Sequence, residues 1–252
     1  MAAMTAVLYR EARIRFTNAI WVLWDVFHPL FYLLVFGVGM DATLAMPLPA
    51  MNGMSYNAFF LGGVLCLASF GIASNSSWGF FVDRDNGIFF EMLTYPLSRA
   101  QFLLGKTLFN LVLGGVQAVI TVGLAWWLLD VPVRSEGLPL LAVLVAGGTA
   151  AWFFFYAIFA LRIRRNDVYN SVNSLFYFYF LFASSMFYPL EPLPAWFRWV
   201  ALTNPVTWHV DLLRYATVGM GDVRLLAWEA AAFTLFAVAS FWCAVRALQQ
   251  QE

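Results

Sequence analysis

The sequence contains a candidate nucleotide-binding motif, in the stretch at 83–107. This stretch ends with Gly105, Lys106 and Thr107, which match the last three positions of a phosphate-binding loop. Such a loop reads G-x-x-x-x-G-K-[ST] and joins a strand to a helix, so that backbone N–H groups surround the phosphates. Here Ala100 occupies the position of the first glycine, and apolar residues flank the motif on both sides. We therefore expect no nucleotide to bind to this chain here.

The same residues are better explained as the start of an apolar helix. Ser98 and Gln101 have the spacing of a capping box, in which each side chain bonds a backbone N–H of the other's turn. Lys106 would then lie about two turns inside the helix and extend its amine toward the lipid head groups.

The residues that could support enzymatic chemistry are few and scattered. The only histidines, His28 and His209, are expected near opposite faces of a membrane, and no metalloprotease, serine-hydrolase or paired-aspartate pattern appears. Asp25 and His28 lie about one helical turn apart before Pro29 and could pair, or Asp25 could bond a neighbouring helix. A proton relay is the weaker reading, because a lone pair makes a poor chain. We expect no enzymatic activity, no metal and no directly bound cofactor.

The composition is that of a membrane protein. Hydrophobic residues make up 62% of the 252 residues and charged residues 11%, with a mean hydropathy of +0.75. Soluble domains carry roughly a quarter charged residues. Both cysteines, Cys66 and Cys243, lie in apolar runs, so a disulfide framework is not indicated. The zero formal net charge gives no indication of a nucleic-acid partner.

Six runs are long and apolar enough to cross a bilayer as helices. They lie at about 19–40, 57–80, 103–129, 138–161, 169–188 and 225–246. Most of the 14 Lys and Arg residues fall on the side of both termini, which predicts cytoplasmic termini in a plasma (inner) membrane. We expect an all-α membrane protein with one transmembrane domain over 1–252. It divides into an interface helix at 1–18, five spans within 19–188, an outer segment at 189–224, and the sixth span and tail at 225–252.

The first cytoplasmic loop is expected to hold a short helix at 87–94. Asn86 can cap it, and Pro96 forbids its continuation. Its apolar side chains, which include Phe90 and Leu93, exceed what a bare solvated loop needs, so it suits a groove on a partner protein. An interfacial turn without a partner is equally compatible with these residues. Polar contacts at the rim could come from Asp83, Asp85, Glu91 and Arg99.

The segment before the first span has the pattern of an interfacial helix. Leu8, Ala12 and Phe16 recur every four residues, and Glu11 can pair with Arg15. A simple basic anchor that orients the first span is the alternative.

The outer segment predicts two short helices near the membrane surface. Pro189 ends the fifth span, Trp196 and Trp199 favour the head-group level, and Asn204 caps a helix with Pro205 in its first position. Such a hairpin could close the outer mouth of a pathway, or it could be an aromatic belt without gating. Glu191, Asp211 and Arg214 could pair across it.

Polar and aromatic residues within the spans could pack the helices or line a pathway. Close helix packing is the more frequent role, with lining second. The candidates for lining are Asn75, Asn110, Gln117, Phe176 and Tyr179.

Three stretches resemble the membrane permeases of type 2 ABC exporters, which move drugs, lipids or glycans. "FFVDRDNGIFFEMLTYPLSRAQFLLGKTL" is similar to the coupling region of that family, "FYPLEPLPAWFRWVALTNPVTWHVDLLR" to its outer re-entrant hairpin, and "HPLFYLLVFGVGM" to its first span. The positions that match the coupling region are Glu91, Leu93, Pro96, Ser98, Arg99, Gly105 and Lys106.

The resemblance implies an ATP-driven exporter for a hydrophobic or amphipathic substrate. ATP and Mg²⁺ would bind to a separate ATPase subunit, and a second permease copy would complete a homodimer, or a related permease a heterodimer. The resemblance adds Arg84, Arg10 and Arg13 to the expected ATPase contacts. An ion-coupled transporter and an intramembrane lipid-modifying enzyme are the alternatives; the first would need inverted repeats and broken helices, and the second a catalytic cluster, and neither is evident.

Overall fold

The chain folds into a bundle of helices. The structure, a computed structural model, describes residues 2–17, 19–43, 53–94 and 98–250. Every regular element in these ranges is helical, which confirms the all-α prediction. The elements are α1 (Ala2–Thr17), α2 (Ala19–Tyr32), η1 (Leu33–Gly37), α3 (Val38–Thr43), α4 (Tyr56–Asp85), α5 (Ile88–Thr94), α6 (Arg99–Leu128), η3 (Ser135–Gly137), α7 (Leu138–Arg162), α8 (Asn166–Phe182), α9 (Ala195–Leu202), α10 (Pro205–Val218) and α11 (Val223–Gln249).

Five helical stretches of the described chain are long and apolar enough to cross a membrane. They are Ala19–Thr43, Tyr56–Asp85, Arg99–Leu128, Ser135–Arg162 and Val223–Gln249. The run expected at 169–188 corresponds to α8, which has only 17 residues, whereas a span needs about 20. The chain is therefore a multi-pass membrane protein, while the sixth span stays a prediction.

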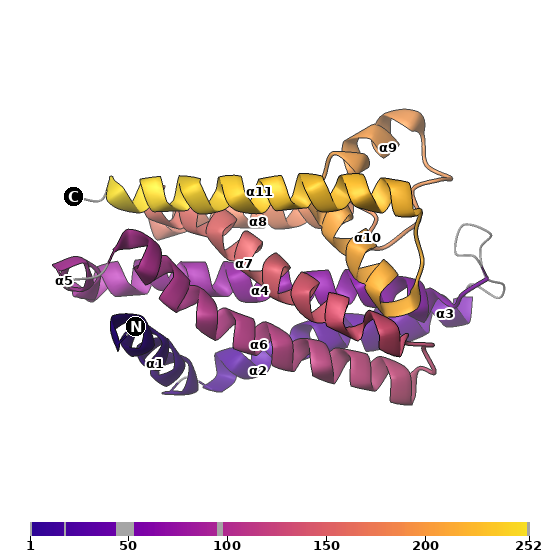
Figure 1. The fold of residues 1–252 in the computed structure, drawn as a ribbon, viewed down its shortest axis with the longest axis horizontal. Coiled ribbons are helices and arrows are strands. Elements are labelled where there is room, and N and C mark those ends of the chain that lie inside the picture. The colour runs from indigo at the N-terminus through magenta and orange to yellow at the C-terminus, as the bar shows by residue number, and fades with distance from the viewer. Residues whose placement is uncertain (1, 18, 44–52, 95–97, 251–252) are drawn as a thin grey trace.

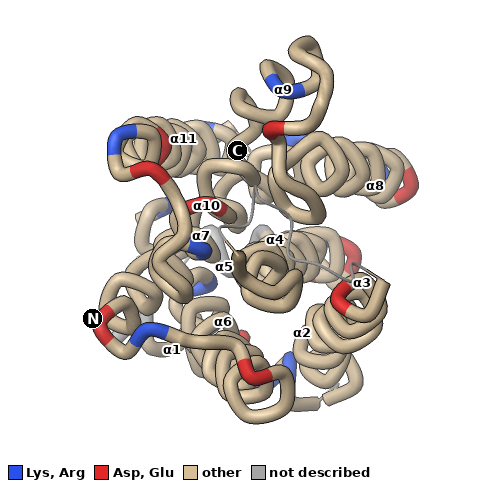
Figure 2. The backbone as a smooth tube through the Cα atoms, turned by 90° about the vertical axis from the view of Figure 1, so that its right-hand side faces the viewer, with Lys and Arg blue, Asp and Glu red and all other residues tan. Residues whose placement is uncertain are grey.

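Helix α4 is the centre of the bundle. Of its most apolar window 94% is buried, against 22% for the stretch Ala19–Thr43. It packs against α2, α6, α7, α8 and α10, and the end-on view places it among them (Figure 2). Two glycines allow these close approaches. A Cβ at Gly62 would lie 2.9 Å from the backbone nitrogen of Arg214, and a Cβ at Gly63 would lie 2.8 Å from the backbone oxygen of Met186.

The two ends of the bundle carry different elements. Both termini lie at the same end as α5, whereas α3 and α9 lie at the opposite end (Figure 1). Because α4 has 30 residues and an α-helix rises 1.5 Å per residue, this one helix runs about 45 Å between the two ends.

The local signals that set helix boundaries are mostly confirmed. Ser98 and Gln101 form the capping box of α6. Asn204 caps α10 with Pro205 in the first turn, and Gly219 ends it with φ 78°, a left-handed conformation that glycine tolerates. The prediction for Asn86 was wrong: it caps the C-terminus of α4, and its amide donates to the Val82 carbonyl.

Candidate functional site

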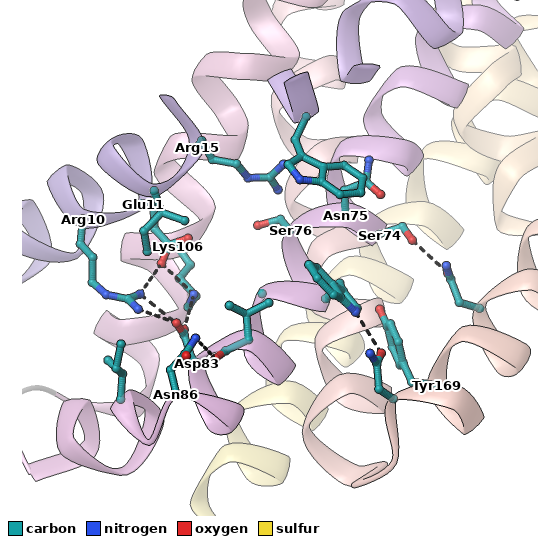
Figure 3. A pocket seen from close by; sticks show the side chains of 18 of the residues that line it. Arg10, Glu11, Arg15, Ser74, Asn75, Ser76, Asp83, Asn86, Lys106 and Tyr169 are labelled. Carbon is teal, nitrogen blue, oxygen red and sulfur yellow. Dashed lines mark hydrogen bonds and ion pairs between the residues drawn. The ribbon is translucent and has the colours of Figure 1, made fainter. Parts of the chain in front are cut away.

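Four charged side chains meet beneath α5, where α1, α4 and α6 converge. Lys106 donates to Glu11 at 2.7 Å and to Asp83 at 3.1 Å, and Arg10 binds both of the same acids (Figure 3). Lys106 is 1% exposed and Asp83 3%. We call Arg10, Glu11, Asp83 and Lys106 the inner charge cluster.

The inner charge cluster is stable because every charge in it is paired. An isolated buried charge costs several kcal/mol, and opposite charges with good hydrogen bonds offset that cost. Burial alone would lower the pKa of Arg10, but the hydrogen bonds and charges of Asp83 and Glu11 outweigh it and raise that pKa above its usual value.

Three predictions about these residues were wrong. Lys106 does not extend toward the head groups, because its amine has two acids within the bundle. Glu11 pairs with Lys106 and Arg10 instead of Arg15. Asp83 lies inside the bundle instead of at the rim of a docking surface, because it is in the last turns of the buried α4.

A second ion pair lies deeper along the same helices. Arg15 donates to Asp25 at 3.1 Å, and Asn75 donates to the other oxygen of Asp25 at 2.6 Å. The carboxylate thus bonds a neighbouring helix, one of the two alternatives for Asp25. His28 instead contacts aromatic rings, with its centroid 5.1 Å from that of Tyr32.

Helix α5 is joined to α4 by a sharp turn and rests on the end of the bundle that carries both termini. Gly87 has φ 71°, a conformation that favours glycine. Phe89 is fully buried against Phe80, with ring centroids 6.2 Å apart. Glu91, in the same short helix, is exposed. One face of α5 is therefore held by the bundle, and Glu91 is available to a partner.

Arg84 ties this turn to α7. Its guanidinium donates to the carbonyls of Ala160, Leu161 and Ile163, at 2.9–3.1 Å, and lies over the rings of Phe81 and Phe89. It thereby satisfies carbonyl groups that the end of a helix leaves without intrahelical donors. Arg84 is a bundle contact and not an exposed one.

The other predicted coupling residues are spread over the same end. Asp85 is the exposed last residue of α4, Arg99 is the half-buried first residue of α6, and Arg13 is exposed on α1. Pro96 lies outside the described residues, as do the side chains of Phe90 and Leu93.

The opposite end is organised by Arg214 on α10. This side chain, 5% exposed, donates to the Phe59 carbonyl of α4 at 3.0 Å, to the Ser185 carbonyl at 2.9 Å and to Asp211 at 2.5 Å. Ser185 also donates to Asp211. Asp211 and Arg214 do form an ion pair, but within α10 and not across the hairpin as predicted, and Glu191 is exposed and gives its backbone carbonyl to Arg198.

The rest of the outer segment presents aromatic rings around this anchor. Trp196 and Trp199 on α9 are 70% and 71% exposed, and Pro189 is buried in the loop before them. Asn204 donates to the carbonyls of Phe180 and Ala183, which fixes α10 to the end of α8. His209 is a packing residue: it accepts from the Trp152 indole at 3.3 Å and its other ring nitrogen lies 3.2 Å from the Leu144 carbonyl.

The residues proposed to line a pathway have different environments. Asn110 and Gln117 are fully buried in α6, and Gln117 donates to the Val26 carbonyl and to Thr121, which supports a packing role for it. Phe176 packs on Phe159, with centroids 4.8 Å apart. The remaining two are more accessible: Asn75 is half-buried and Tyr179 is 44% exposed.

Sequence reasoning missed three sets of residues. Glu11 was assigned to a local pair, although Lys106 offered the nearest buried countercharge. Glu229, 1% exposed on α11, was not noticed. The asparagines Asn166, Asn170 and Asn173 were also passed over, although their spacing of four and three places them on one face of a helix.

Comparison with known proteins gives consistent matches. A family model described as "ABC-2 type transporter" matches residues 2–218. Proteins named "Putative transport permease ycf38" from Porphyra purpurea and Cyanophora paradoxa are each 26% identical, over 191 and 196 residues. Each match covers 75% of this chain and 65% of the relative, so the chain matches slightly less than two thirds of the relatives' length.

Proposed function

The chain belongs to the ABC-2 type transporter family, and from this premise we propose that it forms an export pathway driven through α5. As a member of that family it is a permease, a transport subunit, and the ATP is used by a separate nucleotide-binding ATPase. The proposal concerns how the permease is coupled, what it pairs with and what it carries.

We propose that the ATPase docks on α5 and the adjacent exposed face of α1. The observation that carries this is the position of α5, which connects through Gly87 to the central helix α4 and buries Phe89 while leaving Glu91 exposed. The exposed Asp85 and Arg13 lie at the same end and complete a charged rim. Phe90, Leu93 and Pro96 belong to the same proposed surface.

Movement of α5 would reach the other end through α4. The first turn of α4 accepts from Arg214 through the Phe59 carbonyl, and its Tyr56 hydroxyl donates to the Phe187 carbonyl at 2.8 Å. A displacement at Asp85 is therefore passed by one helix to α10 and the outer hairpin. Rigid helices that shift between two packed arrangements are a common basis of such switching.

The architecture that goes with this function has six spans and cytoplasmic termini in a plasma (inner) membrane. It is one transmembrane domain over 1–252, with interface helix, spans and outer hairpin divided as the sequence predicts. Two copies form the pathway for a hydrophobic or amphipathic substrate, with Asn75 and Tyr179 as the more accessible lining candidates.

Charge reversal at Glu91 tests the docking surface. The permease is co-expressed with its ATPase subunit, and their co-purification and ATP hydrolysis are measured. Glu91→Lys should abolish both. Glu91 is proposed to contact a basic group of the ATPase, and a lysine in its place would repel that group. Glu136→Lys is the matched control: Glu136 is also exposed, with its side chain 85% accessible, but it lies in η3. Unchanged association in Glu91→Lys, or ATP hydrolysis by the permease alone, would overturn the proposal.

A further inference from the structure

A cavity of about 580 Å³ opens beside the inner charge cluster (Figure 3). Its walls come from α1, α2, α4, α8 and the first residue of α5, Ile88, with Lys106 of α6 at one end. This volume falls within the range of about 300–1,000 Å³ typical of small-molecule sites. The contacts described above for α5 and for residues 189–224 do not explain why the bundle has a cavity at this position.

The cavity wall is rich in amide and hydroxyl groups. Asn166, Asn170 and Asn173 line it from α8, and Ser74 and Asn75 face them from α4. The Asn166 oxygen accepts from Trp78 at 2.9 Å, and the Asn173 oxygen accepts from Ser74 at 2.9 Å. These bonds fix the two amides while using only their oxygens, so their N–H groups can donate to a ligand.

Two tryptophans contribute to the apolar part of the wall. The Trp21 and Trp78 rings have centroids 6.2 Å apart and an interplanar angle of 38°. They are 48% and 36% exposed. Aromatic faces pack well on the C–H faces of a sugar ring, while the surrounding amides bond its hydroxyl groups. Such a mixture of ring and amide suits an uncharged, hydroxyl-rich group.

One buried donor in the wall has no acceptor among the described residues. The Nη2 of Arg15 is buried and unbonded, although Nη1 of the same guanidinium donates to Asp25. A buried donor without a partner is costly, so this atom favours a ligand oxygen. The charges around the cavity are balanced: the cations Arg10, Arg15 and Lys106 pair with the acids Glu11, Asp83 and Asp25. A balanced site favours a hydroxyl oxygen over a phosphate.

A second cavity lies next to the first. This smaller cavity, of about 160 Å³, shares Ser74, Asn75 and Asn173 with the larger one and extends to Leu67 and Tyr177. An amphipathic molecule could therefore place a polar head in the larger space and direct its tail between α2 and α8.

We propose that this cavity binds the glycosyl head group of an amphipathic, lipid-like substrate. The inference rests on the proposed transport function and names the substrate class. Trp21 and Trp78 pack on the sugar, the asparagines of α8 bond its hydroxyl groups, and Arg15 donates to a ring or hydroxyl oxygen.

Three detergents with the same twelve-carbon tail test this. The purified full chain is held in amphipol, and each probe is added below its micelle-forming concentration: dodecyl maltoside, dodecylphosphocholine or octaethylene glycol monododecyl ether. A ligand that binds only the folded state raises the unfolding midpoint. Dodecyl maltoside should raise it by about 4 °C, and the other two by much less. Equal shifts for all three would mean that only the tail binds, and a larger shift with phosphocholine would mean recognition of charge; either outcome overturns the proposal.

A pair of tryptophan variants checks the location. Trp78→Leu should remove the maltoside-specific shift, whereas Trp126→Leu should keep it, because Trp126 is 64% exposed on α6 and does not line the cavity. The midpoint of each variant without probe shows whether it folds. If Trp78→Leu folds poorly, Asn170→Leu replaces it, since Asn170 is exposed on α8. A maltoside shift that survives in the folded variant places the sugar elsewhere. These measurements use the permease alone, so they can fail while the Glu91 test succeeds, and the reverse.

Discussion

The inner charge cluster and the contacts of Arg214 with Asp211, Ser185 and Phe59 are both buried, and both connect helices through an ion pair. They differ in the acceptors that their cations bind. In the inner charge cluster, Lys106 and Arg10 bind only the carboxylates of Glu11 and Asp83. At the opposite end of the bundle, Arg214 binds one carboxylate and two backbone carbonyls. Side-chain carboxylates can change partners, whereas backbone carbonyls are fixed in place. The end next to α5 is therefore suited to rearrange, and the end that contains Arg214 is suited to hold α10 on α4.

Removal of Arg214 should have the largest effect on stability. Arg214→Met leaves Asp211 buried without its cation, and the carbonyls of Phe59 and Ser185 lose their guanidinium donors. Breaking a buried pair in this way costs about 3–5 kcal/mol. The free energy of unfolding of the purified permease in mild detergent measures it. A second change, Asp211→Asn, should restore little of this loss because neither carbonyl regains a guanidinium donor.

Lys106→Met should cost somewhat less, about 3 kcal/mol, and should be reversible by a second change. It leaves two acids, Glu11 and Asp83, facing one cation, Arg10. Adding Glu11→Leu removes the excess acid and leaves the Arg10–Asp83 pair, so the double variant should regain roughly 1–3 kcal/mol. Failure of this rescue, or an equally strong rescue of Arg214→Met by Asp211→Asn, would remove the distinction between the two regions.

The difference between the two regions also explains what the sequence could predict. The Asp211–Arg214 pair lies at a spacing of three within one helix, and the capping residues Ser98, Asn204 and Gly219 act on their own turns. Such local interactions follow from helical periodicity. The same reasoning predicted the short helices α5, α9 and α10 close to their observed bounds.

The inner charge cluster could not be found in this way. Lys106 and Glu11 are separated by 95 residues and Arg10 and Asp83 by 73, and only the packing of α1 against α4 and α6 brings them together. Local pairing rules therefore gave Glu11 the wrong partner. The cavity was missed for the same reason, because the asparagines of α8 face α4 and α2 only after the bundle has formed.

The smallest expected change in stability is that of a Glu229 variant. Its sign distinguishes the Arg214 region from the inner charge cluster. The Glu229 carboxyl is 1% exposed and lies next to the carboxyl of Asp211, and no ion pair joins it to a cation among the described residues. The Arg214 region thus holds an acid beyond those it pairs, while the inner charge cluster pairs two cations with two acids. Glu229→Gln removes the possible charge at nearly constant shape, and it should leave stability unchanged or raise it by about 1 kcal/mol.

Asp83→Asn makes the same chemical change in the inner charge cluster, where it removes a bonded partner of both Arg10 and Lys106, and it should destabilise by about 3 kcal/mol. Unfolding measured side by side on the two variants gives the sign of each effect. Equal losses would mean that Glu229 is bound as firmly as Asp83, and the outer end would then be no less dependent on paired carboxylates than the inner one.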